Sequence, residues 1–471
     1  MNPKTLSTKK YYKLNAKAAS AFVIANMIGT GVFTSLGFQL LSTTNATSIA
    51  LIWLVGGITA LCGAIVYSEL GAAIPRSGGE YNFLSEIYHP SLGFLAGWVS
   101  LVVGFAAPVA LACMALSSYV CSIFTAINPM ALAIGVLTII TIVHFNSVNI
   151  GAKMQNILTF AKILIIIVFI IAGLICPADG AANFGPGNGL ELNDVFSVGF
   201  AVSLIWVYYA YSGWNAAAYI VGDIKNPQRN VPLALLISTA FVVVLYLALN
   251  MVFLRTAPVA ELSGEVEVGL ISANHIFGKE GGAILGMLIA LMLTSSISSM
   301  VYVGPRVGQT MGEDYRIFHF LTWRNRRNVP SVAVALQWAI SLLMIITGSF
   351  QKVTEYTGIV LSFCSMLTVA GVYVHRRRYP NAARPYKTFG YPVTPLIFCA
   401  LILCSIIYLV YQDFTKTFVE HSQSAPWTSI ASLTTLLVGW LLWFVAQRIN
   451  KRYYKKHPKA LVERDGLLEN N

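Results

Sequence analysis

The sequence contains little charge. Only 11% of its 471 residues are Asp, Glu, Lys or Arg, less than half of the roughly 25% typical of soluble domains. The hydrophobic residues Ala, Val, Ile, Leu, Met, Phe, Trp, Tyr and Cys together make up 56% of the chain. A soluble chain of this size needs far more charge to keep its surface in water. The composition therefore excludes a cytosolic enzyme, a secreted disulfide scaffold and a disordered chain, and it predicts an all-α integral membrane protein.

Cysteine motifs and metal-ligand clusters are also missing from the sequence. The seven Cys residues lie in or beside apolar runs without CxxC spacing, and no His and carboxylate cluster has the spacing of a metal site. We therefore expect no disulfide framework, no metal, no cofactor and no enzymatic activity. The first 17 residues are polar and carry five Lys, which argues against a cleavable signal peptide.

Apolar runs bounded by charge, Pro or Asn predict twelve transmembrane helices. Their ranges are 18–42, 47–73, 92–126, 129–147, 152–176, 195–222, 231–255, 281–308, 331–349, 353–374, 392–412 and 427–449. We expect a short re-entrant or interfacial segment at 74–91 and a folded external loop at 256–280. The domain organisation is a tail at 1–17, a core of ten helices at 18–374, two helices with their preceding basic loop at 375–450, and a tail at 451–471.

The distribution of Lys and Arg predicts the topology. If the N-terminus is cytoplasmic and each helix reverses the chain, 26 Lys and Arg residues lie on the cytoplasmic side and four on the other. This split follows the positive-inside rule. We therefore expect both termini to be cytoplasmic and the protein to lie in the inner (cytoplasmic) cell membrane. The net charge of +12 then reflects topology and contact with the lipid bilayer, not nucleic acid binding.

Two predicted helices are interrupted in mid-span. The first contains Asn26-Met27-Ile28-Gly29-Thr30-Gly31-Val32, and the sixth contains Tyr209-Ala210-Tyr211-Ser212-Gly213-Trp214-Asn215. They open two halves of five helices each, and because five is odd the second half would be inverted in the membrane. Matching interruptions in two halves are the best sequence pointer to the central site of a transporter.

An unwound turn exposes backbone groups, which is tolerated in a membrane only where they line a polar cavity. The half-helix after Gly31 would present free N–H groups to a carboxylate. The freed carbonyls of Met27, Tyr209 and Ser212 would suit an ammonium group. Together these groups match the backbone of an α-amino acid. The alternative is that Gly29 and Gly31 only allow close helix packing.

At these residues the sequence resembles the amino acid–polyamine–organocation (APC) superfamily, and within it the bacterial L-type amino acid permeases. The matching motifs are Ile28-Gly29-Thr30-Gly31-Val32-Phe33, Ser77-Gly78-Gly79-Glu80-Tyr81, Gly93-Phe94-Leu95-Ala96-Gly97-Trp98, Tyr211-Ser212-Gly213-Trp214-Asn215, Lys225-Asn226-Pro227, Arg384-Pro385-Tyr386 and Gly390-Tyr391-Pro392. The resemblance implies a LeuT-type fold of 5+5 inverted repeats plus two C-terminal helices. It also implies a substrate held between helices 1 and 6.

The resemblance further implies roles for individual residues. Tyr209 matches an aromatic residue that closes over the substrate, Asn215 a polar position facing the site, and Ser212 stands where the family often has Gly. The full set of candidate substrate-binding residues is Met27, Ile28, Gly29, Thr30, Gly31, Tyr209, Tyr211, Ser212, Gly213 and Asn215.

Lys162 is the only cation that this topology assigns to the membrane interior, and an intramembrane ionisable group is a functional candidate by default. In related transporters a fifth-helix Lys stands where sodium-coupled members hold a cation. Lys162 would then make transport sodium-independent and couple it to protons or to exchange. Snorkelling of the side chain to the cytoplasm is the alternative. Hydroxyl groups in 294–299 are possible partners for Lys162, although back-bonding to their own helix suits most of them.

Two acidic residues, Glu69 and Glu80, lie at and just after the end of the second helix, where pairing with Arg or helix capping explains them better than proton transfer. The presumed central site then contains no fixed carboxylate. Small or apolar neutral L-amino acids are the expected substrates, moved by alternating access. The alternatives are a polyamine or cationic amino acid transporter and, from another class, a non-transporting membrane sensor.

A disulfide-linked heavy chain would need an exposed Cys outside the membrane. Cys121 lies near that side but within an apolar run. We therefore expect no such partner, and the protein to be a monomer or homodimer.

Overall fold

The computed structural model describes residues 14–43, 45–146, 151–176, 179–180, 195, 197–327, 329–418 and 426–457. Within these residues the regular secondary structure is helical and is joined by turns and loops, apart from one isolated bridge between Leu14 and Ile224. Most of the predicted tail at 1–17 and most of the tail at 451–471 lie outside the described residues. The all-α prediction is confirmed.

The first half of the chain contains one broken helix and one helix with a π-helical turn. Its elements are α1 (Ala16–Met27), α2 (Gly31–Gln39), α3 (Ala46–Ala73), α4 (Glu80–Ile87), α5 (Pro90–Val99), the π-helix η1 (Ser100–Gly104), α6 (Ala106–Cys121), α7 (Pro129–Asn146) and α8 (Gly151–Ile175). The break separates α1 from α2, whereas η1 joins α5 to α6. The segment predicted as re-entrant or interfacial, 74–91, forms the short helix α4 and the start of α5.

The second half follows the predicted order of helices. Its elements are α10 (Val198–Tyr211), α11 (Ala216–Tyr219), η3 (Val221–Asp223), α12 (Pro227–Thr256), α13 (Val259–Leu262), α14 (Val268–Asp314), η4 (Arg316–Thr322), α15 (Ser331–Thr347), α16 (Phe350–Arg378), α17 (Val393–Phe418) and α18 (Trp427–Lys456). The predicted external loop at 256–280 contains α13 and the start of α14, which is kinked at Gly278.

Eight helices of the described chain are long and apolar enough to cross a membrane. Shorter apolar helices lie in the four remaining predicted ranges, at Pro129–Phe145, Thr159–Ile175, Val198–Tyr211 and Ser331–Thr347. The protein is therefore a multi-pass membrane protein. The count of twelve spans and the sides of the two termini stay predictions.

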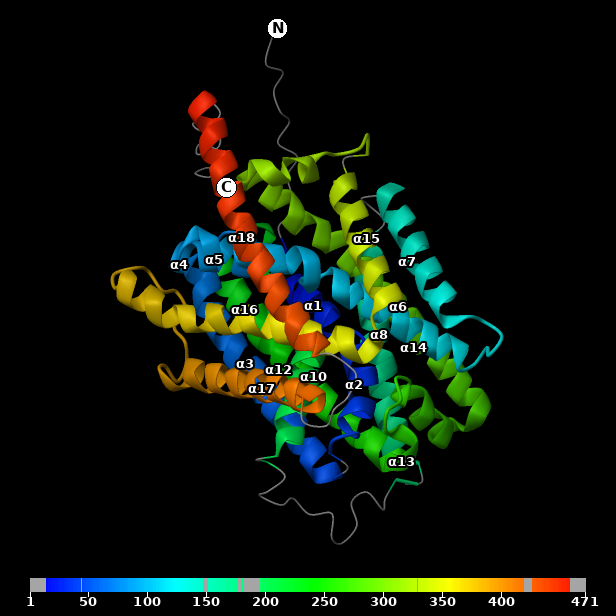
Figure 1. The fold of residues 1–471 in the computed structure, drawn as a ribbon. Coiled ribbons are helices and arrows are strands. Elements are labelled where there is room, and N and C mark those ends of the chain that lie inside the picture. The colour runs from blue at the N-terminus through cyan, green and yellow to red at the C-terminus, as the bar shows by residue number, and fades with distance from the viewer. Residues whose placement is uncertain are drawn as a thin grey trace.

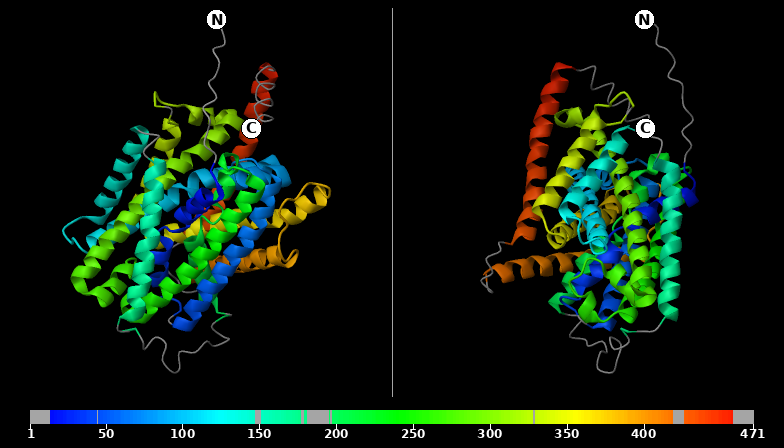
Figure 2. Two further views of the ribbon diagram at one scale, coloured as in Figure 1. Left: turned by 180° about the vertical axis from the view of Figure 1, so that it is seen from behind. Right: turned by 90° about the vertical axis from the view of Figure 1, so that its right-hand side faces the viewer.

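Helix α10 lies at the centre of the molecule and α18 at its edge (Figures 1 and 2). Every residue of α10 from Phe200 to Tyr211 is buried, packed against α2, α3, α16 and α17. Helix α18 exposes a row of large apolar side chains and extends past the other helices at its C-terminal end. Because apolar faces are stable toward lipid, α18 is expected to line the perimeter, while the broken helices occupy the interior.

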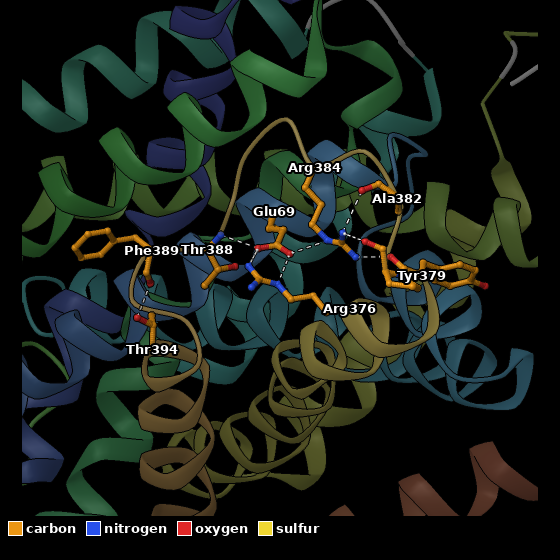
Figure 3. Close-up of polar contacts among 9 residues, drawn as sticks. Glu69, Arg376, Tyr379, Ala382, Arg384, Thr388, Phe389 and Thr394 are labelled. Atoms are coloured by element: carbon orange, nitrogen blue, oxygen red, sulfur yellow. Dashed lines mark hydrogen bonds and ion pairs between the residues drawn. The ribbon is translucent and has the colours of Figure 1, made fainter.

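The carboxylate of Glu69, fully buried near the end of α3, holds the loop between α16 and α17 in place (Figure 3). It accepts two hydrogen bonds from Arg376, at 2.9 and 2.6 Å, and one from the Thr388 N–H at 2.6 Å. The Arg384 guanidinium lies 3.6 Å away. A bidentate Arg–carboxylate pair is a strong, geometrically specific contact. The prediction that Glu69 pairs with Arg is confirmed.

Candidate functional site

The first helix break separates α1 from α2 by three residues. The Gly29 N–H donates to the Met27 carbonyl at 2.8 Å, and the Phe33 N–H donates to the Thr30 carbonyl at 2.9 Å. Within the described chain, the N–H groups of Thr30 and Gly31 have no backbone acceptor. They stand at the N-terminus of α2, where the helix dipole favours a negative group. The break therefore has the features of a carboxylate site.

The second break separates α10 from α11. The Ser212 N–H turns back to the Tyr209 carbonyl at 3.0 Å. Gly213 has φ 98°, a left-handed conformation that favours glycine. A Cβ atom at this position would lie 2.7 Å from the Asn26 carbonyl oxygen. Gly213 therefore allows both the turn and the close approach of this segment to the end of α1.

The two breaks touch each other. The Tyr209 hydroxyl and the Thr30 hydroxyl are 2.7 Å apart and share a buried hydrogen bond. A Cβ atom on Gly31 would lie 2.3 Å from Cα of Ala210, so Gly31 serves close packing. Gly29 is different, because a Cβ atom there would meet nothing nearer than the Met27 oxygen at 3.9 Å. Close helix packing thus explains Gly31 but not Gly29.

Two cavities meet at the breaks. The smaller, about 20 Å³, is lined by six predicted site residues, Met27, Gly29, Thr30, Gly31, Tyr209 and Ser212. The larger, about 110 Å³, is lined by four, Tyr211, Ser212, Gly213 and Asn215. Both cavities are also lined by Asn26, Pro108, Ser212 and Met300. A ligand held at the breaks could therefore extend from one cavity into the other.

Some predicted contact groups are already occupied within the protein. The Met27 carbonyl, expected to accept from an ammonium group, accepts from the Tyr246 hydroxyl on α12 at 2.6 Å. The Tyr211 hydroxyl points away and donates to the Trp53 carbonyl at 3.3 Å. Ile28 is buried and does not line either cavity. Tyr246 is missing from the sequence prediction because it lies in an uninterrupted apolar run with no local signal.

The Lys162 side chain on α8 is fully buried. Its ammonium donates to the Ser296 hydroxyl on α14 at 2.7 Å and to the Ile28 carbonyl at 3.3 Å. Ser296 also donates to the Ile28 carbonyl, at 3.4 Å. Lys162 therefore does not snorkel to an interface. It ties α8 and α14 to the break in the first helix.

The Glu80 carboxylate, at the start of α4, corrects the expectation that no carboxylate faces the central site. It lines the larger cavity beside Asn215 and is 3% exposed. It accepts hydrogen bonds from Tyr67, Ser365 and Asn215 and, among the described residues, has no ion pair with an Arg. Burial raises the pKa of the Glu80 carboxyl above its ordinary value, while these three donors oppose the shift.

Most of the sequence matches a known protein family. The sequence profile described as "Amino acid permease" matches residues 14–441. The chain belongs to the amino acid permease family. This places it in the APC superfamily, as the motifs around both helix breaks predict, and its relatives are transporters, not enzymes.

Curated relatives of this permease cover nearly the same length. It is 28% identical over 480 residues to the human b(0,+)-type amino acid transporter 1, covering 98% of this chain and 94% of the relative. It is 26% identical over 452 residues to the mouse large neutral amino acids transporter small subunit 2, covering 94% and 81%. General amino acid transport across a membrane is therefore the shared activity.

Proposed function

We propose that this permease is a secondary active transporter that moves amino acids across the cytoplasmic membrane by alternating access. The observation that carries the proposal is the meeting of two helix breaks at one cavity, with free N–H groups at the start of α2. These N–H groups would bind the substrate carboxylate. The α1–α2 and α10–α11 segments would then move together, because Tyr209 and Thr30 join them.

The proposed transport is sodium-independent. The Lys162 ammonium lies against a freed carbonyl of the first break and a hydroxyl of α14, so a positive charge already occupies this position. A second cation there would be repelled at short range. Proton coupling and substrate exchange are both compatible with a fixed ammonium at this point.

Small or apolar neutral L-amino acids are the proposed main substrates. The smaller cavity is lined by Ala112, Pro108 and Met300 beside the two breaks, and apolar walls favour apolar side chains. The second candidate, a cationic amino acid or amine, is favoured by one specific observation, the Glu80 carboxylate in the adjoining cavity.

Reconstitution into liposomes tests this proposal. Labelled L-alanine, L-serine and L-leucine would be offered with and without a sodium gradient, and with and without unlabelled amino acid inside. We expect uptake that does not require sodium and that responds to a proton gradient or to internal amino acid. Absence of uptake under every condition would contradict transport, and clear stimulation by sodium would contradict the role of Lys162.

We further propose that the permease works as a monomer or homodimer without a disulfide-linked heavy chain. The name of one relative calls it a small subunit. In this chain Cys121 ends α6, is partly buried and is a free thiol. Uptake by the purified chain alone, unchanged in Cys121→Ala, is the expected result. A requirement for a second protein would contradict it.

A further inference from the structure

Two buried carboxylates near the end of α3 have different surroundings. Glu69 is paired with two Arg residues. Glu80, eleven residues later, accepts only from neutral donors, with Tyr67 and Ser365 both at 2.7 Å and Asn215 at 3.2 Å. A buried carboxylate is normally paired with a cation or a metal. Pairing with Arg explains why Glu69 is buried, but it does not explain why Glu80 is buried.

Only one of the two carboxylate oxygens of Glu80 accepts hydrogen bonds from the described residues. All three donors reach Oε1, and within the described chain no hydrogen bond reaches Oε2. Three donors on one oxygen stabilise the ionised form. An ionised carboxylate with one free oxygen can still accept a charge-assisted hydrogen bond.

The cavity beside Glu80 suits a positive group. Its described lining contains no Lys, Arg or His, so Glu80 gives it a net negative charge. Aromatic rings form much of the wall, among them Trp214 in the second break, Tyr219 on α11 and Phe398 on α17. Aromatic faces attract ammonium and guanidinium groups.

The position of this cavity relative to the breaks gives it a role in substrate recognition. It shares Asn26, Pro108, Ser212 and Met300 with the smaller cavity, where the substrate backbone is proposed to bind. The side chain of a substrate held there would therefore extend toward Glu80. Asn215, which donates to Glu80, is the last residue of the second break, just before α11, and so links the carboxylate to the α10–α11 segment that is proposed to move with the first break.

We propose that Glu80 and the aromatic wall form a subsite for the positively charged end of a basic amino acid side chain. The inference rests on the proposed function and widens the substrate class from neutral to basic amino acids. The carboxylate binds the guanidinium or ammonium group through Oε2. It also disfavours acidic side chains, since two like charges would be brought together in a buried cavity.

Two ligands of similar shape but different charge separate the effect of the side-chain charge on binding from the effect of side-chain shape. L-Arginine and L-citrulline have side chains of nearly the same shape, but only arginine carries a positive charge. Binding of each would be measured by thermal shift on the purified full chain, using ligand titrations. In the wild type we expect arginine to bind on the order of tenfold more tightly than citrulline, the ratio expected for one charge-assisted hydrogen bond.

Two variants of α4 complete the test. Glu80→Gln keeps an oxygen for the three donors and removes the charge, so the arginine preference should fall to about one while citrulline binding is retained. Glu86→Gln, exposed on the same helix, should keep the wild-type preference. An equal affinity for both ligands in the wild type, a preserved preference in Glu80→Gln, or equal loss of both ligands would overturn the subsite.

The pH dependence gives an independent readout. Among the described residues, the other titratable groups that face Glu80 are Tyr67, Tyr219 and Cys364, and phenol and thiol groups are ordinarily neutral near pH 7. The arginine preference should therefore be present above the raised pKa of Glu80 and disappear as the pH falls through it. A pH-dependent uptake that Glu80→Gln abolishes, with no change in the ligand ratio, would indicate a proton site and overturn the proposal.

Failure of this inference and failure of the proposed function give different results. Uptake of L-leucine by Glu80→Gln at the wild-type rate, with the arginine preference unchanged, would reject only the subsite. Absence of L-leucine uptake in the wild type and in every variant would reject the transport proposal itself.

Discussion

At the residue level, the buried Lys162 ammonium is the group on which the proposed sodium-independent transport depends. Its ammonium joins α8, α14 and the first helix break through Ser296 and the Ile28 carbonyl. A buried ammonium with neutral partners is costly, so such a residue persists in a membrane protein when it contributes to function. The Lys162 charge is placed at the first helix break, because the Ile28 carbonyl that it contacts lies between α1 and α2.

Replacement of Lys162 by Met keeps the length of the side chain and removes its charge and donors. Leaving a buried acceptor without its donor costs about 1–3 kcal/mol. We expect the rate of amino acid uptake to fall about tenfold or more while the protein still folds. Initial rates in liposomes, with thermal unfolding measured in parallel, check this. Lys352→Met, at an exposed position of α16, is the control, and an unchanged rate in Lys162→Met would contradict the account.

At the scale of the secondary-structure elements, the two broken helices are packed tightly at one point. Gly31, at the start of α2, lies against the backbone of Ala210 on α10. A methyl group there would stand 2.3 Å from the Ala210 Cα, so the backbone has to move. Gly31 is thus a packing residue as well as a neighbour of the cavity.

Gly31→Ala is therefore expected to destabilise the protein. Overpacking of a well-packed interior costs about 1–3 kcal/mol, which should appear as a lower unfolding temperature in detergent. Gly135→Ala on α7, where a Cβ atom meets nothing within 4 Å, should leave stability unchanged. Equal unfolding temperatures for Gly31→Ala and the wild type would show that the contact is looser than described.

The Glu69 cluster is a second test at this scale. Glu69→Gln leaves Arg376 and Arg384 without their buried anion, and breaking a buried pair in this way costs about 3–5 kcal/mol. We expect faster hydrogen exchange in the loop at 379–392 and a lower unfolding temperature. Glu313→Gln, at an exposed position of α14, should change neither. Unaltered exchange in the loop would mean that Glu69 does not hold it.

For the whole molecule, the sequence predicts most of the helix order and the position of both breaks. Transmembrane helices are recognised in the sequence by their long apolar runs, since a helix that crosses the lipid bilayer requires such a run. The Gly and Ser residues at 29, 31, 212 and 213 mark where a helix is interrupted. The position of Lys162 near the first break follows from the family resemblance.

The surroundings of Glu80 could not be predicted in this way. They depend on the loop before α4 folding back, with the N–H groups of Gly78 and Gly79 donating to the carbonyls of Tyr219 and Ala218. These contacts join residues about 140 positions apart in the sequence. Sequence spacing carries no signal for such a contact, and the same is true of Tyr246, which reaches the first break from α12.

The central claim is that the amino acid binds between the two helix breaks. Gly29→Val is the variant to test, because Gly29 lines the smaller cavity and a Cβ atom there meets nothing nearer than the Met27 oxygen at 3.9 Å. Uptake of labelled L-leucine by liposomes containing Gly29→Val would be compared with the wild type and with Gly135→Val. We expect Gly29→Val to fold normally and to lose uptake, while Gly135→Val retains uptake. Wild-type uptake by Gly29→Val would place the substrate elsewhere and contradict the account.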